Sequence, residues 1–347
     1  MRLEVSDSID ELEFEWSALA RAARNLFGTP EWVRAWQESF GDPHGLRLVS
    51  GRDDDGRLLG VVPLVVERRG PLRIARFAGH GVGDILGPIV DPSVPGLART
   101  LLEGALESAV TDWDVFLGER MRESDGWGSG WGDTVMRTEA NPTSRLTDWL
   151  DWEAFERSLS RKLRREIRHD VRVLANHHAM IIRRVAADDD LPPALDTLFR
   201  LHALRFGERS SFAPRAAFHR RFAAIALARG WLRLWTLEVD GRAVASRYDF
   251  SYGDAYYAYN AGRDPAWARG SVGLVLRAHT MQTAFRESVA DYHFLRGDEG
   301  YKSRFGTTDD PLVSIARARS WLGRRAISLG LRLREQHRAR RIVHLQA

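Results

Sequence analysis

The sequence contains no cysteine, which excludes disulfides, thiolate metal sites and a cysteine nucleophile. Lysine is almost absent too, because Lys162 and Lys302 are the only lysines among 51 basic residues. Arginine and lysine are not interchangeable in a tight site, so a lysine kept against this bias is a candidate functional residue. Long apolar runs are also missing, and the longest, 58–66, has about half the length of a membrane-spanning helix.

The composition is that of a globular protein, with 44% hydrophobic and 28% charged residues. A chain of 347 residues exceeds the usual size of one hydrophobic core, so we expect two domains. Breaks in the pattern place them at 1–148 and 149–312, followed by a basic amphipathic helix at 313–347. The acidic first residues lack the apolar centre of a signal peptide, and we expect a cytoplasmic protein.

Several common catalytic motifs are not found. There is no phosphate-binding P-loop, no dinucleotide fingerprint, no HExxH zinc motif and no GxSxG nucleophile elbow. The histidines are scattered, so no metal site is expected.

Hydrophobic periodicity predicts strands and helices in alternation, which is typical of a mixed α/β fold. Helices are expected at 9–40 (interrupted at 28–30), 97–110, 152–177, 195–206, 215–229 and 271–288. Strands are expected at 46–50, 57–67, 73–78, 85–90, 114–118, 135–137, 144–147, 180–185, 231–239, 242–252, 255–261 and 291–295.

An aromatic strand begins the segment that carries the functional prediction. Side chains alternate along a strand, so Tyr257 and Tyr259 should share one face, with Tyr256 and Asn260 on the other. The sequence leaves two alternatives for these residues: packing in the core, or contact with a substrate.

A glycine-containing turn follows this strand and opens a helix. Arg269, Gly270, Ser271, Val272 and Gly273 are candidate phosphate ligands, because backbone amides and the positive end of the helix dipole attract anions. Ser271 is the expected N-cap. A simple helix cap without a ligand is the alternative.

A polar cluster follows the last strand, and strand ends are where sites are built in α/β domains. Tyr301 is a candidate general acid, and Asp298 or Glu299 could accept a proton from the attacking group. Lys302 belongs to the same cluster. The alternative is a salt-bridged turn, with the carboxylates paired to Arg296 and Arg304.

The order of elements in the second half resembles the GNAT acetyltransferase core. Residues 152–306 look more narrowly like the CelD-type acetyltransferases associated with exopolysaccharide biosynthesis, and more distantly like Fem-type aminoacyl transferases. The likeness is carried by Lys162-Leu-Arg-Arg-Glu-Ile-Arg168, Leu201-His-x-x-Arg205, Val239-Asp-Gly-x-x-Val-Ala245, Asp264-Pro265 with Ser271-Val-Gly273, and Phe294-Leu-Arg-Gly-Asp-Glu-x-Tyr-Lys302.

The resemblance implies two tandem GNAT-like domains, the first degenerate. It also implies acetyl-CoA or another acyl-CoA as donor, no metal, and direct transfer to an amine or hydroxyl. The pantetheine arm would lie between splayed strands, with the pyrophosphate at 269–273. The glycines depart from the usual GNAT register, Gln/Arg-x-x-Gly-x-Gly/Ala. Substrate contacts are assigned to His202, Arg205, Tyr257, Asn260 and Arg296.

Other functions remain open. A Fem-like enzyme would take its donor from aminoacyl-tRNA and use the basic helix at 157–172 to hold phosphates. A non-catalytic binding protein could use the same fold. The expected acceptor is a small molecule or a sugar or lipid-linked precursor, and no DNA partner is expected. The basic tail could contact an anionic membrane surface peripherally.

Overall fold

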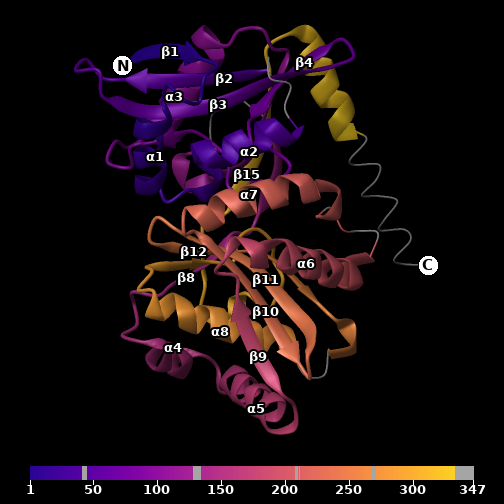
Figure 1. Ribbon diagram of the computed structural model, residues 1–347. Helices are drawn as coiled ribbons and strands as arrows, with labels where there is room; N and C mark the ends of the chain where they lie inside the picture. Colours follow the sequence, from indigo (N-terminus) through magenta and orange to yellow (C-terminus); the bar gives the residue numbers. More distant parts are fainter. Residues whose placement is uncertain (41–44, 128–133, 208–209, 211, 268–270, 333–347) are drawn as a thin grey trace. The chain divides into compact units, whose positions relative to one another are not determined.

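A computed structural model describes residues 1–40, 45–127, 134–207, 210, 212–267 and 271–332. The chain divides into two compact units. The first unit combines residues 1–139 with the chain from 311 onward, and the second contains residues 140–310. Each unit has its own mixed sheet with helices packed on it (Figure 1).

The first unit is built on a sheet with strand order β1-β2-β3-β4-β6-β15-β7, and β5 pairs with β3. Its core includes Phe77, Phe116 and Trp127, all almost fully buried. Its strands are β1 (Arg2–Ser6), β2 (Leu46–Arg52), β3 (Leu58–Arg69), β4 (Leu72–Phe77), β5 (Ile89–Val90), β6 (Val115–Arg122), β7 (Thr134–Glu139) and β15 (Leu312–Ala318), and its α-helices before residue 139 are α1 (Glu13–Ala22), α2 (Pro30–Phe40) and α3 (Leu97–Gly104).

The second unit has the strand order β14-β8-β13-β12-β11-β10-β9. Helices α4, α5 and α8 cover one face of this sheet, and α6 and α7 cover the other (Figure 1). Its elements are β8 (Pro142–Arg145), α4 (Trp152–Ser158), α5 (Arg161–His177), β9 (Met180–Arg184), α6 (Leu191–Phe206), α7 (Ala216–Ala228), β10 (Leu232–Val239), β11 (Arg242–Tyr252), β12 (Ala255–Arg263), α8 (Val272–Arg286), β13 (Asp291–His293) and β14 (Thr308–Asp309).

The chain returns to the first unit after completing the second. β15 pairs with both β6 and β7, so the helix predicted from residue 313 is wrong at its start. Helix begins only at residue 321. Pairing on both sides identifies Leu312–Ala318 as a strand, and the basic residues that suggested a helix lie mostly beyond it.

The long helix predicted at 152–177 is two helices. Leu159 leaves the helical conformation, and the Ser160 hydroxyl accepts a hydrogen bond from the Leu163 amide at 3.2 Å. Serine is a favoured N-cap because its oxygen satisfies one of the free amides of the first turn. The apolar stripe of Leu163, Ile167 and Leu174 then faces the core as predicted.

The two central strands of the second sheet diverge. β12 and β13 are parallel, but their pairing covers only Ala255–Tyr257 against Asp291–His293. β12 continues six residues further, to Arg263, and among the described strands it pairs there with β11 alone. A wedge therefore opens between the far end of β12 and the segment that follows β13.

Close approach of α6 closes the other side of β12. A methyl group at Gly262 would clash with the His202 amide nitrogen, so only glycine allows α6 to pack directly on the strand. None of the helices in the described ranges is both long and apolar enough to cross a membrane.

Candidate functional site

A cavity of about 260 Å³ lies at this wedge in the second unit. Its lining includes Ser271 and Gly273 at the start of α8, and Tyr301. Arg205 of α6 completes the set of predicted residues that the structure brings together. The two segments singled out in the sequence, the opening of the helix and the cluster after the last strand, thus share one cavity.

The start of α8 is shaped by Ser271. This residue has a left-handed backbone conformation with φ of 45°, and its side chain makes no capping hydrogen bond. Ser271 thus occupies the predicted N-cap position, but its hydroxyl does not cap the helix. The Ser271 carbonyl accepts from the amides of Leu274 and Val275, at 2.7 and 3.1 Å. The amides of Val272 and Gly273 belong to the first turn, where no intrahelical acceptor exists. Arg269 and Gly270 lie outside the described residues.

Three arginines from three different elements line the cavity: Arg205 of α6, Arg263 at the end of β12 and Arg277 of α8. Arg277 lies over the Tyr301 ring at 4.2 Å and the Phe294 ring at 5.5 Å, and Arg205 lies over Phe206 at 4.6 Å. Among the residues that the structure describes, none forms an ion pair or hydrogen bond with these three guanidinium groups. A planar guanidinium stacked on a ring still has its N–H edge free for a ligand.

The arginines disfavour one another's charge. Loss of solvent around the guanidinium, followed by the charge of Arg263, lowers the pKa of Arg205, and Arg277 contributes in the same direction. Burial, followed by the charge of Arg247, lowers the pKa of Arg277. Arginine stays protonated at neutral pH, so the cavity is strongly positive. An anion would offset this repulsion.

The other arginines that line the cavity, Arg247 and Arg304, form ion pairs with carboxylates. Arg247 is almost fully buried and holds Asp249 in two hydrogen bonds of 2.8 and 3.0 Å. Burial opposes the charge on Arg247, but Asp249 outweighs it and raises the pKa of Arg247. Arg304 is paired with Glu166 of α5. The contrast separates arginines that hold the protein together from arginines left for a ligand.

Lys302, predicted as catalytic, has its ammonium group turned inward. It is 4% exposed and donates hydrogen bonds to the carbonyls of Leu295, Arg296 and Gly297, at 3.0, 2.7 and 3.3 Å. Left-handed conformations at Leu295 and Gly297 turn these carbonyls toward one point. The compact ammonium therefore holds together the turn that carries Tyr301 to the cavity.

The two candidate carboxylates do not line the cavity. Glu299 forms an ion pair with Lys302 at 2.8 Å. Burial alone would raise the pKa of Glu299, but the hydrogen bond and charge of Lys302 lower it below its ordinary value. An ionised, paired carboxylate is a weak proton acceptor. Asp298 is exposed to solvent.

The other predicted substrate residues also lie outside the cavity lining. His202 is a buried residue of α6, where burial and then the charge of Arg205 lower its pKa to about 4, so its ring is neutral at pH 7. Tyr257 is fully buried and stacks on His293 at 5.0 Å, which is core packing. The Arg296 side chain is half-buried.

Asn260 shows where the alternation argument fails. The register between β11 and β12 shifts, so that two residues of β12, Ala258 and Tyr259, lie opposite one residue of β11, Asp249. Asn260 is therefore paired with Tyr248 and shares its face of the sheet rather than that of Tyr256. Its side-chain oxygen accepts a hydrogen bond from the Ala261 amide at 2.8 Å.

Arg263 and Arg277 are the residues that sequence reasoning missed. In a chain whose cations are nearly all arginine, one more arginine carries little information. One pattern could have found Arg277, because it follows Gly273 by four residues and so lies on the same helix face as the predicted phosphate turn. Within the described part of the chain, no group of three or more His, Asp or Glu is arranged to hold a metal ion.

Comparison with known proteins supports the fold of this unit and of the whole chain. Residues 161–303 match the acetyltransferase (GNAT) domain family. A search of curated protein sequences finds no match.

Solved structures with the same arrangement cover nearly the full chain. FemX superposes with a TM-score of 0.63 at 13% identity, covering 90% of this chain and 97% of its own. A tandem GNAT protein from the clavulanic acid biosynthesis pathway gives a TM-score of 0.53 at 14% identity, covering 91% and 98%. L-PGS from Bacillus licheniformis gives 0.52 at 12% identity, covering 86% and 95%. At such identities the likeness establishes the fold alone.

The predicted mixed α/β architecture is thus confirmed by the two sheets and by the tandem GNAT neighbour. The second unit matches the GNAT acetyltransferase domain family in sequence, and the chain shares its fold with Fem-type and tandem GNAT proteins.

Proposed function

We propose that this protein is an acyltransferase that moves an acetyl or other acyl group from acyl-CoA to an amine or hydroxyl acceptor. The observation that carries the proposal is the shared cavity: Ser271 and Gly273 at the start of α8 and Tyr301 line the same space at the wedge between β12 and the segment after β13. A diphosphate at the helix start would aim the thioester toward Tyr301.

The unpaired edge of β12 supports this orientation. None of the described strands pairs with residues 258–263 on the β13 side. Backbone groups on that side, other than the Ala261 amide that is bonded to Asn260, can therefore pair with the two amide groups of a pantetheine arm. The arm would then lie between the strands as an extra extended segment. Most of the catalytic effect would come from this positioning.

Direct transfer needs one proton movement at the cavity. The acceptor nitrogen or oxygen attacks the thioester carbonyl, a C–N or C–O bond forms and the C–S bond breaks. Tyr301 donates its hydroxyl proton to the departing thiolate, and the proton released by the acceptor passes to solvent and restores the phenol. Glu299 is held by Lys302, so we assign it to positioning the turn rather than to proton transfer.

Calorimetry with acetyl-CoA, combined with a transfer assay using radiolabelled acetyl-CoA, tests the proposal. We expect saturable binding, and we expect Tyr301→Phe to bind acetyl-CoA normally while turnover falls by about 100-fold. The matched control is Tyr252→Phe, a buried tyrosine of β11 that does not line the cavity. No binding of acyl-CoA by the folded protein would overturn the proposal.

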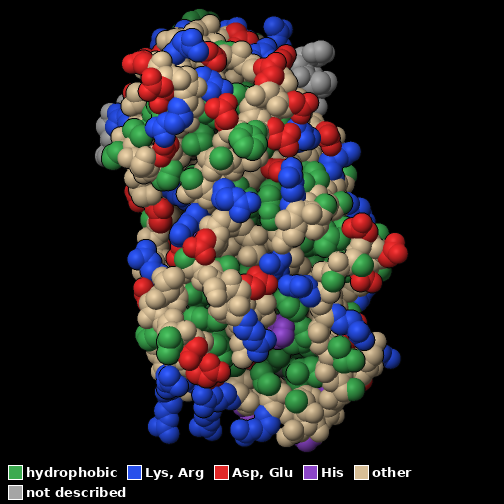
Figure 2. Space-filling view, turned by 60° about the vertical axis from the view of Figure 1, so that its left-hand side comes forward, with side chains coloured by type: hydrophobic (Ala, Val, Ile, Leu, Met, Phe, Trp, Pro, Cys, Tyr) green, Lys and Arg blue, Asp and Glu red, His purple; other side chains and the backbone are tan. Residues whose placement is uncertain are grey.

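A second candidate is a Fem-like transferase that takes its donor from aminoacyl-tRNA, and α5 favours it. Arg161, Arg165 and Arg172 are exposed along one side of α5, opposite its buried stripe, and no described residue pairs with them. Basic side chains project at the bottom of the view in Figure 2, at the level of α5. An unneutralised row of arginines suits a phosphate backbone.

The two candidate functions are distinguished by supplying acetyl-CoA and charged tRNA separately as donors. Transfer from labelled charged tRNA but not from acetyl-CoA would select the second candidate. In that case Arg161→Gln with Arg165→Gln and Arg172→Gln should reduce tRNA binding and its salt dependence. Under acyl-CoA transfer the same variant should act normally.

The acceptor is proposed to be a sugar or a lipid-linked precursor, as expected from the CelD-type resemblance. The helix at 321–332 exposes Trp321 and Leu329 beside Arg324, Arg325 and Arg332, a combination suited to an anionic membrane surface. Co-sedimentation with anionic liposomes, with and without residues 320–347, tests this contact. Equal pelleting of the two proteins would exclude it.

A further inference from the structure

The charges lining the cavity are more numerous than one donor diphosphate at the helix start explains. Arg205, Arg263 and Arg277 all reach it without a described carboxylate partner, while Arg247 and Arg304 beside them are paired. Burial and then the charge of Arg263 lower the pKa of Arg205, and burial and then the charge of Arg247 lower the pKa of Arg277. Such a cluster is stabilised when a ligand brings negative charge.

The three arginines divide by position. Arg263 lies at the helix start, since a methyl group on Gly273 would be 3.5 Å from its Cδ. Arg277 is one turn further along α8 and stacks on Tyr301. Arg205 comes from α6, which lies on the opposite face of the sheet from α8. Arg263 is thus placed for the donor phosphates, and Arg205 and Arg277 for a group beside Tyr301.

We propose that Arg205 and Arg277 bind a carboxylate or phosphate group of the acceptor, so that the enzyme acts on acidic acceptors. This inference rests on the proposed acyltransferase function. The acceptor enters where the two guanidinium groups converge, and its anionic group fixes the nucleophile near the thioester. The two guanidinium groups also discriminate against neutral acceptors, because a neutral acceptor would leave both arginines unpaired in a partly desolvated cavity.

The same chemistry could come from an acidic acyl chain on the donor. The experiment therefore uses CoA itself, which has no acyl group, and small free dianions. Protein saturated with CoA is titrated with inorganic phosphate and with succinate in a calorimeter. We expect both anions to bind the CoA complex, which shows that the second anion site is separate from the donor diphosphate.

Substitutions then assign the sites. Arg205→Gln and Arg277→Gln should each weaken phosphate binding to the CoA complex roughly tenfold or more, and leave CoA affinity within about twofold. Arg263→Gln should do the reverse. Arg242→Gln, at an exposed arginine at the start of β11 that does not line the cavity, is the matched control and should change neither. Thermal unfolding of each variant verifies that it is folded.

Steady-state kinetics show whether the acidic group belongs to the acceptor or to the acyl chain of the donor. If the acidic group belongs to the acceptor, acidic acceptors should show a lower KM than neutral analogues with acetyl-CoA, and Arg277→Gln should remove the difference. A preference for acidic acyl-CoA donors, with no preference among acceptors, would overturn the acceptor assignment.

Other results would contradict the inference in distinguishable ways. Competition between phosphate and CoA would mean that the arginines serve only the donor, which refutes the inference and leaves the proposed function intact. Unchanged phosphate binding in Arg205→Gln and Arg277→Gln would refute it as well. If CoA fails to bind, the acyltransferase proposal falls, and phosphate titration of the free protein still tells whether Arg205 and Arg277 form an anion site.

Discussion

Each unit contains a short parallel pair of strands, but the space beyond the pair differs between the two units. In the first unit β4 and β6 are parallel and their pairing ends at Arg76 and Leu117, as that of β12 and β13 ends at Tyr257 and His293. Beyond that point in the first unit, the segment that contains Gly83 and Leu86 bonds to Arg120 of β6. The Leu86 amide donates to the Arg120 carbonyl at 3.0 Å, and the Arg120 guanidinium donates to the Gly83 carbonyl. The second unit has a cavity there.

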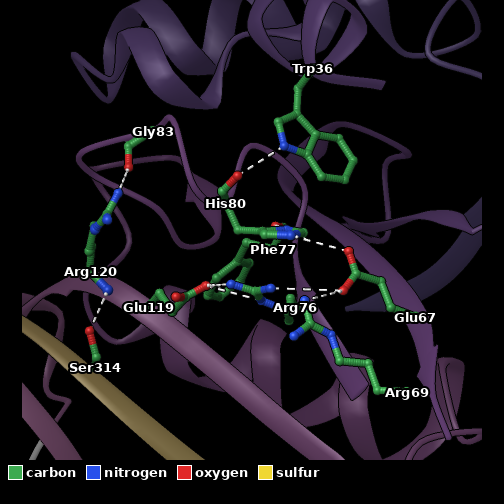
Figure 3. A network of polar contacts seen from close by, with 10 residues as sticks. All are labelled: Trp36, Glu67, Arg69, Arg76, Phe77, His80, Gly83, Glu119, Arg120 and Ser314. Atoms are coloured by element: carbon green, nitrogen blue, oxygen red, sulfur yellow. Dashed lines mark hydrogen bonds and ion pairs between the residues drawn. The ribbon is translucent and has the colours of Figure 1, made fainter. Parts of the chain in front are cut away.

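The charges follow the same contrast (Figure 3). In the first unit Arg76 is paired with Glu119 at 2.6 Å, and His80 lies 3.2 Å from Glu67 and 3.0 Å from the Phe77 carbonyl. Each ionisable group in this network has a partner within the chain. The second unit leaves three arginines at its cavity unpaired by the described residues. The paired charges stabilise the first unit, whereas the three unpaired arginines of the second unit predict a ligand.

The largest effect on stability is expected where the second unit does close a pair. Asp249→Asn leaves Arg247 buried with only part of its hydrogen bonding, and should lower the free energy of unfolding by about 3–5 kcal/mol. Chemical denaturation measures it. Arg277→Gln is the comparison and should cost far less, because it breaks no ion pair; equal losses would contradict the distinction.

Lys302→Met tests whether the lysine is structural. It leaves the carbonyls of Leu295, Arg296 and Gly297 without their donor and should destabilise the protein by about 1–3 kcal/mol. Turnover should fall because the turn bearing Tyr301 loosens. If instead stability is unchanged and only kcat is lost, Lys302 has a chemical role.

Glu119→Gln probes the closed network of the first unit. The pair with Arg76 is partly exposed, so we expect a loss of about 1 kcal/mol in the free energy of unfolding. Affinity for acetyl-CoA should stay within about twofold. A large drop in ligand affinity would mean that this network also serves a site.

The smallest expected change in stability comes from Gly273→Ala. A methyl group there makes only an ordinary 3.5 Å contact with Arg263, and alanine favours helix, so stability should rise by up to about 1 kcal/mol. The same methyl projects into the cavity at the proposed diphosphate position and should weaken acetyl-CoA binding. Unchanged affinity would move the diphosphate away from α8.

Local patterns predicted much of the secondary structure. The break at 28–30, the hairpin of β2 and β3, and the series from β9 to β12 lie close to their expected positions, because turn residues and apolar periodicity act over a few neighbours. The errors have local causes. Ser160 starts a new helix inside an unbroken apolar stripe, and the register shift in β12 reverses the side of Asn260.

The sequence by itself determined the mixed α/β class, the two-part organisation and the two segments that meet at the cavity, since these depend on periodicity and on local clusters of polar residues. Only the tertiary structure decided that β15 completes the first sheet and that Lys302 points inward. It also decided that Arg205, Arg263 and Arg277 line one cavity with no ion-pair partner among the described residues. These features depend on contacts between residues far apart in the chain. An arginine's role follows from whether a carboxylate reaches it, and no sequence spacing encodes that.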